Sequence, residues 1–536
     1  MADQVPNLLS RIGGGKAYRS AARTMIEGTS HNSGDASVSL RSLDLCPCTW
    51  TDVSAGADFP PRFGAAQATR GQTGIQSGYL RAATYLLTLC IVLYASASLA
   101  AGQRSSPVER ALGFLFTQQV GKPLKVGVDG IRNVDFPGNW PQYFHLQGTE
   151  EFRVREVSPF MVAFIHHSLT GVVEENRRAL GLSQRDLRLA RLMRQRAVAF
   201  MKGFESPPGS ADAGTFAFWP YDAAPYLPGV KLTILLTAWL QGPILGGQRV
   251  PINLRIYPST LAIPSDADVT ATTYATLLDD AIFDGGSGSE VAFERFFLEW
   301  RDLGVVPRRL NPDWLPPASG AFLTWLTYRD RPFPLFPNDV DLVVNANVLY
   351  ALARYDRLDL PGVEEAVEYI NLVTALGLHR DRLEEITDYY PDNLAFQYVV
   401  SRAFHEGPVT TLEPAIAILA DDLEASVLFR AEGTAYWDRG EPHLNTAFAV
   451  LTLLNAGRET AIIDQAIEYL VAEQNADGGF DEATFFVGRN DGGQVFEFTS
   501  ASFSTAMALE ALVRHRVDRC SRSKDRPRPS QPQRCR

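Results

Sequence analysis

Helical segments of two kinds alternate along most of this chain, and this alternation limits the possible folds more than any other feature. Segments of the first kind are charged on one face and apolar on the other, and they cover 108–119, 187–204, 291–302, 362–373, 412–424 and 462–473. Segments of the second kind are apolar on nearly all sides, and they cover 159–169, 267–278, 342–354, 394–404, 444–455 and 500–514. A helix that is apolar all round must be buried.

This order predicts an all-α fold, a single (α/α)6 toroid of helical hairpins that spans 103–515. One hairpin cannot bury its own apolar face, so neighbouring hairpins must stack, and closure of the ring removes the exposed ends. Two long insertions, 207–264 and 307–337, interrupt the repeat and are rich in Pro, Gly and aromatic residues. Long ordered insertions usually serve a site. We therefore expect both to lie over one mouth of the ring.

The last amphipathic segment ends in a recognisable motif, Gln474 followed by Asp477, Gly478, Gly479 and Phe480. The glycine pair supplies backbone angles that end a helix and reverse the chain. This pattern resembles the repeat of the squalene cyclases and protein prenyltransferases, in which Gln, Gly and an aromatic residue recur after each outer helix. Where that repeat most often has Trp, this chain has Phe. The resemblance implies the helical toroid of the terpenoid cyclase superfamily; squalene-type cyclases pair two helical domains, and this chain has room for one.

A second resemblance lies at the start of the segment 267–278. Asp266, Asp268, Thr270 and Ala271 match the acid motif of the class II terpenoid cyclases, Asp-x-Asp-Asp followed by Thr-Ala, while Val269 replaces the last Asp. The resemblance implies that Asp268, with Asp266 beside it, protonates an alkene or epoxide. Such chemistry requires a carboxylic acid kept protonated by burial and aromatic rings that stabilise carbocations. The alternative is structural, because carboxylates at a helix N-terminus cap backbone amides.

Another acidic pair, Asp339 and Asp341, opens the next apolar segment, and Asn345 and Asn347 lie inside it. Amides in an otherwise apolar helix are unfavourable unless they form hydrogen bonds or face a cavity. The inner helices of a toroid begin at one end of the ring, so we expect both acidic pairs to converge at one mouth. There Asp339, Asp341 and Asn345 would bind a substrate or a divalent cation, since their oxygens suit Ca²⁺ or Mg²⁺. Capping is the alternative here too, and we predict no specific metal ligand.

Three more residues are predicted to bind substrate. His443 begins an inner segment, and protein prenyltransferases hold zinc with Asp, Cys and His; the toroid segment has no Cys, which argues against prenyl transfer to a thiol. Trp219 and Trp325 lie in the insertions. With Trp140 and Trp437 they could equally stack on sugar rings, since several exported (α/α)6 enzymes act on polysaccharides with a carboxylate pair.

Bulk properties exclude several other functions. The formal net charge of -11 argues against a nucleic-acid-binding protein. All five cysteines lie outside the predicted toroid, so we expect neither a disulfide framework nor a thiolate-bound metal there; they are Cys46, Cys48, Cys90, Cys520 and Cys535. No Walker motif, GxGxxG after a strand, HExxH or GxSxG elbow is found.

The N-terminal part predicts export. Residues 82–101 form an apolar run with Arg81 before it and small residues at its end, which is the pattern of a signal peptide. The run is also just long enough to be an uncleaved membrane anchor. Segment 1–79 is interpreted as a disordered or spurious extension, 80–101 as the signal or anchor, and 516–536 as a disordered basic tail. We therefore expect a periplasmic, secreted or membrane-anchored protein.

Three functions remain open at this level, and whether the chain is an enzyme is not decided by its sequence. The first is an isoprenoid-handling, cyclase-like protein with acid catalysis at Asp266 and Asp268. The second is an exported carbohydrate-active protein that uses the same acidic mouth, and the third is a non-catalytic toroid that binds a partner. A water-excluding pocket lined by aromatics favours the first, an open groove with exposed Trp the second, and a filled centre the third.

Overall fold

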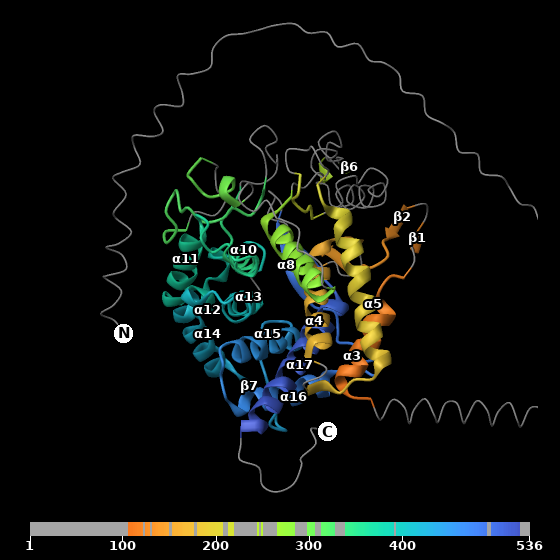
Figure 1. Cartoon of the computed structure of the whole chain (residues 1–536). Coiled ribbons are helices and arrows are strands. Elements are labelled where there is room, and N and C mark those ends of the chain that lie inside the picture. The colour runs from red at the N-terminus through yellow and green to blue at the C-terminus, as the bar shows by residue number, and fades with distance from the viewer. Residues whose placement is uncertain are drawn as a thin grey trace, which may run out of the picture. The chain divides into compact units, whose positions relative to one another are not determined.

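The structure is a computed structural model of the chain. It describes residues 105–121, 124–128, 131–148, 153–175, 179–206, 213–218, 244–245, 248–249, 265–284, 297–305, 312–326, 338–390, 393–489 and 495–525. All of them belong to one unit, which spans Thr88–Arg536. This part is mostly helical with short strands, as Figure 1 shows.

Six helices that are largely apolar pack in a closed cycle. Each contacts the next, and the last contacts the first. In chain order they are α4 (Pro159–Glu175), α8 (Ala267–Asp284), α10 (Leu342–Arg354), α13 (Ala395–His405), α15 (Pro442–Asn455) and α17 (Ala501–Asp525). These are the apolar segments of the sequence pattern, and their prediction as buried helices is confirmed because nearly every side chain of α10, α13 and α15 is buried.

The amphipathic helices lie outside this cycle (Figure 1). They are α3 (Pro107–Gln118), α5 (Gln184–Met201), α11 (Val363–Ala375), α14 (Glu413–Ser426) and α16 (Ala461–Glu473). Short helical turns accompany them: η4 (Lys202–Phe204), α12 (Leu378–Asp381), η5 (Leu383–Glu385) and η6 (Thr410–Leu412). Of the amphipathic segment predicted at 291–302, the structure describes 297–302, and 297–299 are helical.

The described residues also form short β-sheets, so the predicted all-α class was incomplete. One sheet has the order β4-β3-β10-β9 and is antiparallel throughout; its strands are β3 (Gln142–Leu146), β4 (Val154–Glu156), β9 (Thr484–Arg489) and β10 (Val495–Thr499). Three hairpins complete the set: β1 (Leu124–Val128) with β2 (Ile131–Asp135), β5 (Ile244–Leu245) with β6 (Gln248–Arg249), and β7 (Leu428–Phe429) with β8 (Ala435–Tyr436). Strands β9 and β10 are rich in Phe, Val and Thr, which favour strands.

The C-terminal helix is longer than predicted. Helix α17 continues past residue 515 to Asp525, so the first part of the predicted disordered tail is helical, and 526–536 lie outside the described residues. His515 lies 2.6 Å from Asp464 of α16, and Arg522 pairs with Asp518 one turn earlier. The basic residues that suggested a tail are therefore the charged face of a helix. Cys520 is buried in it, which corrects its placement outside the fold.

The motif after α16 joins the two ends of the described chain. The side-chain amide of Gln474 donates to the carbonyl oxygens of Pro107 at 3.0 Å and Gly478 at 2.8 Å. The backbone N–H of Phe480 donates to the hydroxyl of Thr505 at 3.0 Å. One turn thus ties α16 to the first helix, α3, and to the last, α17.

Several predictions fall outside the described residues, among them the segments 1–79 and 80–101 and the site residue Trp219. Within the described part, no helix is both long and apolar enough to cross a membrane.

Candidate functional site

Aromatic side chains pack together in the middle of the helix cycle. They are Phe160 and Phe164 of α4, Tyr398 of α13, Phe448 of α15, Phe485 of β9 and Phe503 of α17, and each is at most 2% exposed. The ring of Phe485 stacks on Phe503 at 3.9 Å and on Phe160 at 5.6 Å between centroids. Strand β9, which the sequence pattern did not predict, therefore contributes the ring of Phe485 to the aromatic cluster in the middle of the helix cycle.

Asp268 lies at the edge of this aromatic cluster, in the first turn of α8. Its side chain is buried, and both oxygens accept hydrogen bonds: one from the Tyr390 hydroxyl at 2.6 Å, the other from the Asn347 amide at 2.7 Å. Burial raises the pKa of Asp268 to about 7, although these two hydrogen bonds oppose the shift, and the nearby Asp341 adds to it. This carboxyl can therefore carry a proton near neutral pH.

Tyr390 connects the carboxyl of Asp268 to the aromatic rings. Its ring lies 5.6 Å from that of Phe485, 6.2 Å from Phe486 and 6.3 Å from Phe160. Burial and the neighbouring carboxylate of Asp268 raise the pKa of the Tyr390 hydroxyl well above its usual value, so this hydroxyl stays protonated and donates. A proton-bearing carboxyl beside ring faces is the combination that the acid motif implied.

Asp266 and Asp341 cap helices. One oxygen of Asp266 accepts the backbone N–H of Val269 at 2.6 Å, and burial raises the pKa of Asp266 well above its usual range. Asp341 accepts the backbone N–H groups of Val343 and Val344 with one oxygen. Its other oxygen accepts the Thr387 hydroxyl and the N–H groups at 388 and 389. These are the capping contacts that were the structural alternative, and substrate binding by Asp341 stays a prediction.

Other polar residues near the two acidic pairs connect the loop 322–325 to α10 and to the residues just before it. The side-chain oxygen of Asn345 accepts the backbone N–H of Phe322 at 3.0 Å, and its side-chain nitrogen donates to the carbonyl oxygen of Phe322 at 2.9 Å. The backbone carbonyl of Asp339 accepts from Thr324. The indole N–H of Trp325 donates to the Tyr389 hydroxyl at 3.0 Å. Asn345 thus forms the hydrogen bonds that an amide in an apolar helix requires.

The structure brings most of the predicted site residues together. The charges of Asp266, Asp268 and Asp341 all act on Tyr390, and those of Asp339 and Asp341 act on Tyr389. This agrees with the expected convergence of the two acidic pairs. His443 is different, because its ring stacks on Phe480 and its Nε2 lies 2.9 Å from the carbonyl oxygen of Asp481. No described contact links it to the acidic mouth.

Two of the tryptophans considered for sugar stacking are buried, which corrects that reading. Trp140 is 0% exposed and donates to the Leu115 carbonyl, and Trp437 is 3% exposed and donates to the Leu423 carbonyl. Both are core residues whose N–H groups are satisfied, so neither presents a ring face to a polysaccharide.

A buried arginine leads from Asp268 to a second polar cluster. Arg402 donates to the Asn347 oxygen at 2.6 Å, and its guanidinium lies 4.5 Å from the ring centres of Phe164 and Tyr350. Sequence reasoning singled out Asn347 and placed Tyr390 at the start of an inner helix without a role, and it missed Arg402. A charged residue inside the apolar segment 394–404 was the available signal for Arg402, since such a residue is rarely buried without a function or partner.

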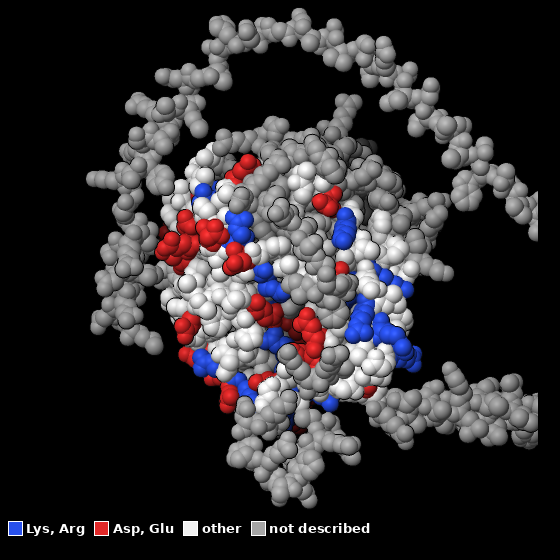
Figure 2. Space-filling view, in the orientation of Figure 1, with Lys and Arg blue, Asp and Glu red and all other residues white. Residues whose placement is uncertain are grey.

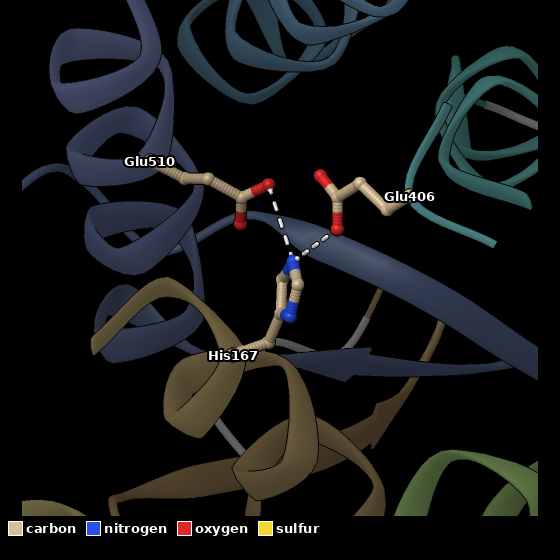
Figure 3. A group of neighbouring side chains, drawn as sticks. All are labelled: His167, Glu406 and Glu510. Carbon is tan, nitrogen blue, oxygen red and sulfur yellow. Dashed lines mark ion pairs between the residues drawn. The ribbon is translucent and has the colours of Figure 1, made fainter. Parts of the chain in front are cut away.

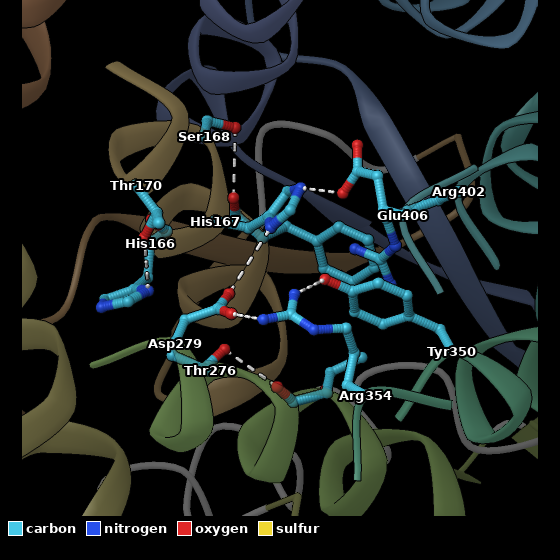
Figure 4. Close-up of polar contacts among 12 residues, drawn as sticks. His166, His167, Ser168, Thr170, Thr276, Asp279, Tyr350, Arg354, Arg402 and Glu406 are labelled. Carbon is cyan, nitrogen blue, oxygen red and sulfur yellow. Dashed lines mark hydrogen bonds and ion pairs between the residues drawn. The ribbon is translucent and has the colours of Figure 1, made fainter. Parts of the chain in front are cut away.

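The second cluster gathers around His167 of α4 (Figure 3). The Nε2 atom of His167 lies 2.9 Å from a carboxylate oxygen of Glu406 and 3.8 Å from one of Glu510, while Nδ1 lies 3.9 Å from Asp279. Arg354 bonds to Asp279 at 2.5 Å and to Tyr350 at 3.0 Å (Figure 4). Figure 2 shows acidic and basic side chains side by side in a hollow over the middle of the helix cycle.

The two adjacent histidines of α4 differ in charge. Burial and the nearby Arg194 lower the pKa of His166 to about 3, so it stays neutral. Burial alone would lower the pKa of His167 as well, but Glu406, Tyr350 and Glu510 raise it well above its usual value. The sequence marks both as core histidines on an apolar helix, and only the structure separates them.

The similarities of this chain to known proteins are distant. No protein-family model and no curated protein matches it. Among solved structures, the apo type II terpene cyclase MstE from Scytonema is 13% identical, with a TM-score of 0.43 over 76% of this chain and 97% of that one. A variant of MstE bound to geranylgeranyl dihydroxybenzoate gives a TM-score of 0.42 at 13% identity, over 76% and 96%. A protein from Actinoplanes gives 0.39 at 15% identity, over 77% and 98%. At these TM-scores the likenesses carry no argument.

Proposed function

We propose that the chain is a terpenoid cyclase-like (α/α)6 toroid in which Asp268 protonates an isoprenoid alkene. The closed cycle of six buried helices with amphipathic helices outside supports the toroid. One observation carries the chemistry: the buried carboxyl of Asp268, with its pKa raised to about 7, lies against Tyr390 at the edge of the aromatic cluster.

The proposed reaction begins with transfer of the Asp268 proton to a terminal alkene carbon of the substrate. The resulting tertiary carbocation accepts electrons from the next alkene, which closes a ring. The cyclic cation then loses a proton to solvent, and solvent returns a proton to Asp268. The product is an isomer of the substrate. Aromatic faces stabilise cations by electrostatic attraction, and the rings of Phe160, Phe485 and Phe486 lie beside Tyr390, which contacts Asp268. Asp266 supports Asp268 by capping the N-terminus of α8.

Replacement of Asp268 by Asn tests this function. The purified protein is incubated with linear polyprenyl compounds, and products are separated by gas chromatography with mass spectrometry. Removal of a general acid slows turnover about 100-fold or more. Asp302→Asn is the matched control, because Asp302 is equally buried and accepts hydrogen bonds from Ser319. Wild-type turnover by a folded Asp268→Asn protein would refute acid catalysis.

The aromatic packing favours a second candidate, a toroid that binds a partner without catalysis. Phe485 and Phe503 are fully buried and stack at 3.9 Å, so this part of the centre is filled by the protein itself. Wild-type protein that binds a polyprenyl chain or a protein partner but converts no substrate in the screen above would favour this candidate.

Export is part of the proposal and rests on the apolar run at 82–101. N-terminal sequencing of protein recovered from its native host tests it. A mature chain that begins near residues 98–102 supports a cleaved signal, whereas a chain that begins near Met1 argues against export.

A further inference from the structure

We propose that His167, Glu406 and Glu510 form a binding site for a first-row divalent cation such as Zn²⁺ or Mn²⁺, beside Asp279 of α8. Asp279 follows Asp268 by eleven positions on α8, which corresponds to about 16 Å along a helix. The site is therefore separate from the acidic mouth and does not depend on the acid chemistry proposed there.

The three ligand atoms have suitable spacing. One nitrogen of His167 and one oxygen from each glutamate lie within 4.8 Å of one another (Figure 3). A cation among them reaches bond lengths of about 2.0–2.2 Å after small side-chain shifts. An imidazole ligand favours a transition metal over Mg²⁺ or Ca²⁺, which prefer oxygen ligands alone.

Each ligand is oriented by a partner on its far side. The second oxygen of Glu406 pairs with Arg514, and the second oxygen of Glu510 accepts the Ser168 hydroxyl at 2.9 Å. The Nδ1 atom of His167 faces the carboxylate of Asp279, which Arg354 holds in turn (Figure 4). A carboxylate behind a metal-binding histidine is the usual arrangement in protein metal sites.

A small cavity with a mostly apolar lining adjoins His167. His167, Asp279, Tyr350 and Arg402 line it, and it has space for about one water molecule. Arg402 is 2% exposed, and its Nε atom has no hydrogen-bond partner among the described residues. A metal-bound water in this cavity would accept a hydrogen bond from that atom. This buried N–H group has no acceptor among the described residues, although the charges of Glu406 and Glu510 also act on Arg402.

Isothermal titration of chelator-treated protein with ZnCl₂, MnCl₂ or MgCl₂ tests the site. We expect one equivalent of Zn²⁺ or Mn²⁺ to bind and Mg²⁺ to bind more weakly. His167→Gln should weaken binding at least 100-fold, and Asp279→Asn, which removes the negative charge that faces Nδ1 of the histidine, about 10- to 100-fold. His515→Gln is the matched control, since His515 pairs with Asp464 outside this cluster, and it should bind as wild type does.

Pulsed electron paramagnetic resonance of Mn²⁺-loaded wild-type protein provides a test that needs no variant. Coupling of the metal to an imidazole nitrogen is expected. A wild-type protein that binds no stoichiometric metal, a spectrum without that coupling, or unchanged affinity in folded His167→Gln would each show that the cluster is an internal ion pair. None of these outcomes bears on Asp268, whose variant should bind metal normally.

Discussion

Asp268 and its partners decide the chemistry at the scale of single residues. Asp266 and Asp341 use their oxygens to cap the first turns of α8 and α10, whereas the oxygens of Asp268 accept only side-chain donors, from Tyr390 and Asn347. Asp266 and Asp341 thus act as caps, while the carboxyl of Asp268 faces other side chains. The resemblance to the cyclase acid motif pointed to the same residue, but its partner Tyr390 is 122 positions away and could not be predicted from spacing.

The raised pKa of Asp268 predicts a pH dependence of stability. The folded state binds this proton more tightly than the unfolded chain, whose pKa is near 3.8. The group therefore contributes its full stability below pH 3.8 and loses it as pH rises to about 7. The loss amounts to at most about 4 kcal/mol. Urea unfolding from pH 4 to 8 should show wild type losing more stability than Asp268→Asn. Parallel curves for the two proteins would mean that the pKa is not raised.

At the scale of elements, hydrophobic periodicity predicted the buried helices well. The segment 342–354 coincides with α10 because every turn of it is apolar and its N-cap, Asp341, accepts two backbone N–H groups. The pattern failed at β9 and β10, where short aromatic runs form strands only because they pair with β3 and with each other. It also failed at the end of α17, where Arg519, which pairs with Asp464, was mistaken for part of a disordered tail.

The turn after α16 gives a prediction at this scale. Gly478 has φ +92, and a Cβ atom there would overlap the carbonyl oxygen of Arg110 in α3. Gly440 also has φ +92 but has open space around it. Gly478→Ala should therefore lower the free energy of unfolding by about 2 kcal/mol or more, and Gly440→Ala by about 1 kcal/mol. Urea denaturation of both variants checks this. Equal losses would show that the contact with α3 does not matter.

The whole helix cycle depends on the contact between its first and last inner helices, α4 and α17. Helix α17 packs on both α15 and α4, and Phe503 contacts Phe164, Phe448 and Phe485. The alternation of helices predicted such a cycle, since no hairpin buries its own apolar face. What fills its centre could not be predicted, because Phe485 comes from a strand outside the repeat.

Phe503→Ala should destabilise the entire cycle. Truncation of a buried phenylalanine typically lowers the free energy of unfolding by about 3–5 kcal/mol. Phe429→Ala is the control, since Phe429 is 53% exposed and its loss should change stability by about 0.5 kcal/mol or less. Thermal unfolding followed by circular dichroism measures both. A small effect of Phe503→Ala would show that α17 does not close the cycle.

Deuterium incorporation tests the central claim for the molecule most directly. A polyprenyl substrate is incubated with wild-type protein in ²H₂O, and the mass of the product is measured by mass spectrometry. If Asp268 starts the reaction with a solvent-exchangeable proton, the cyclic product carries one deuterium at the carbon that was protonated, and the Asp268→Asn protein yields no such product. A cyclic product without deuterium, or an equally labelled product from folded Asp268→Asn, would contradict protonation by Asp268.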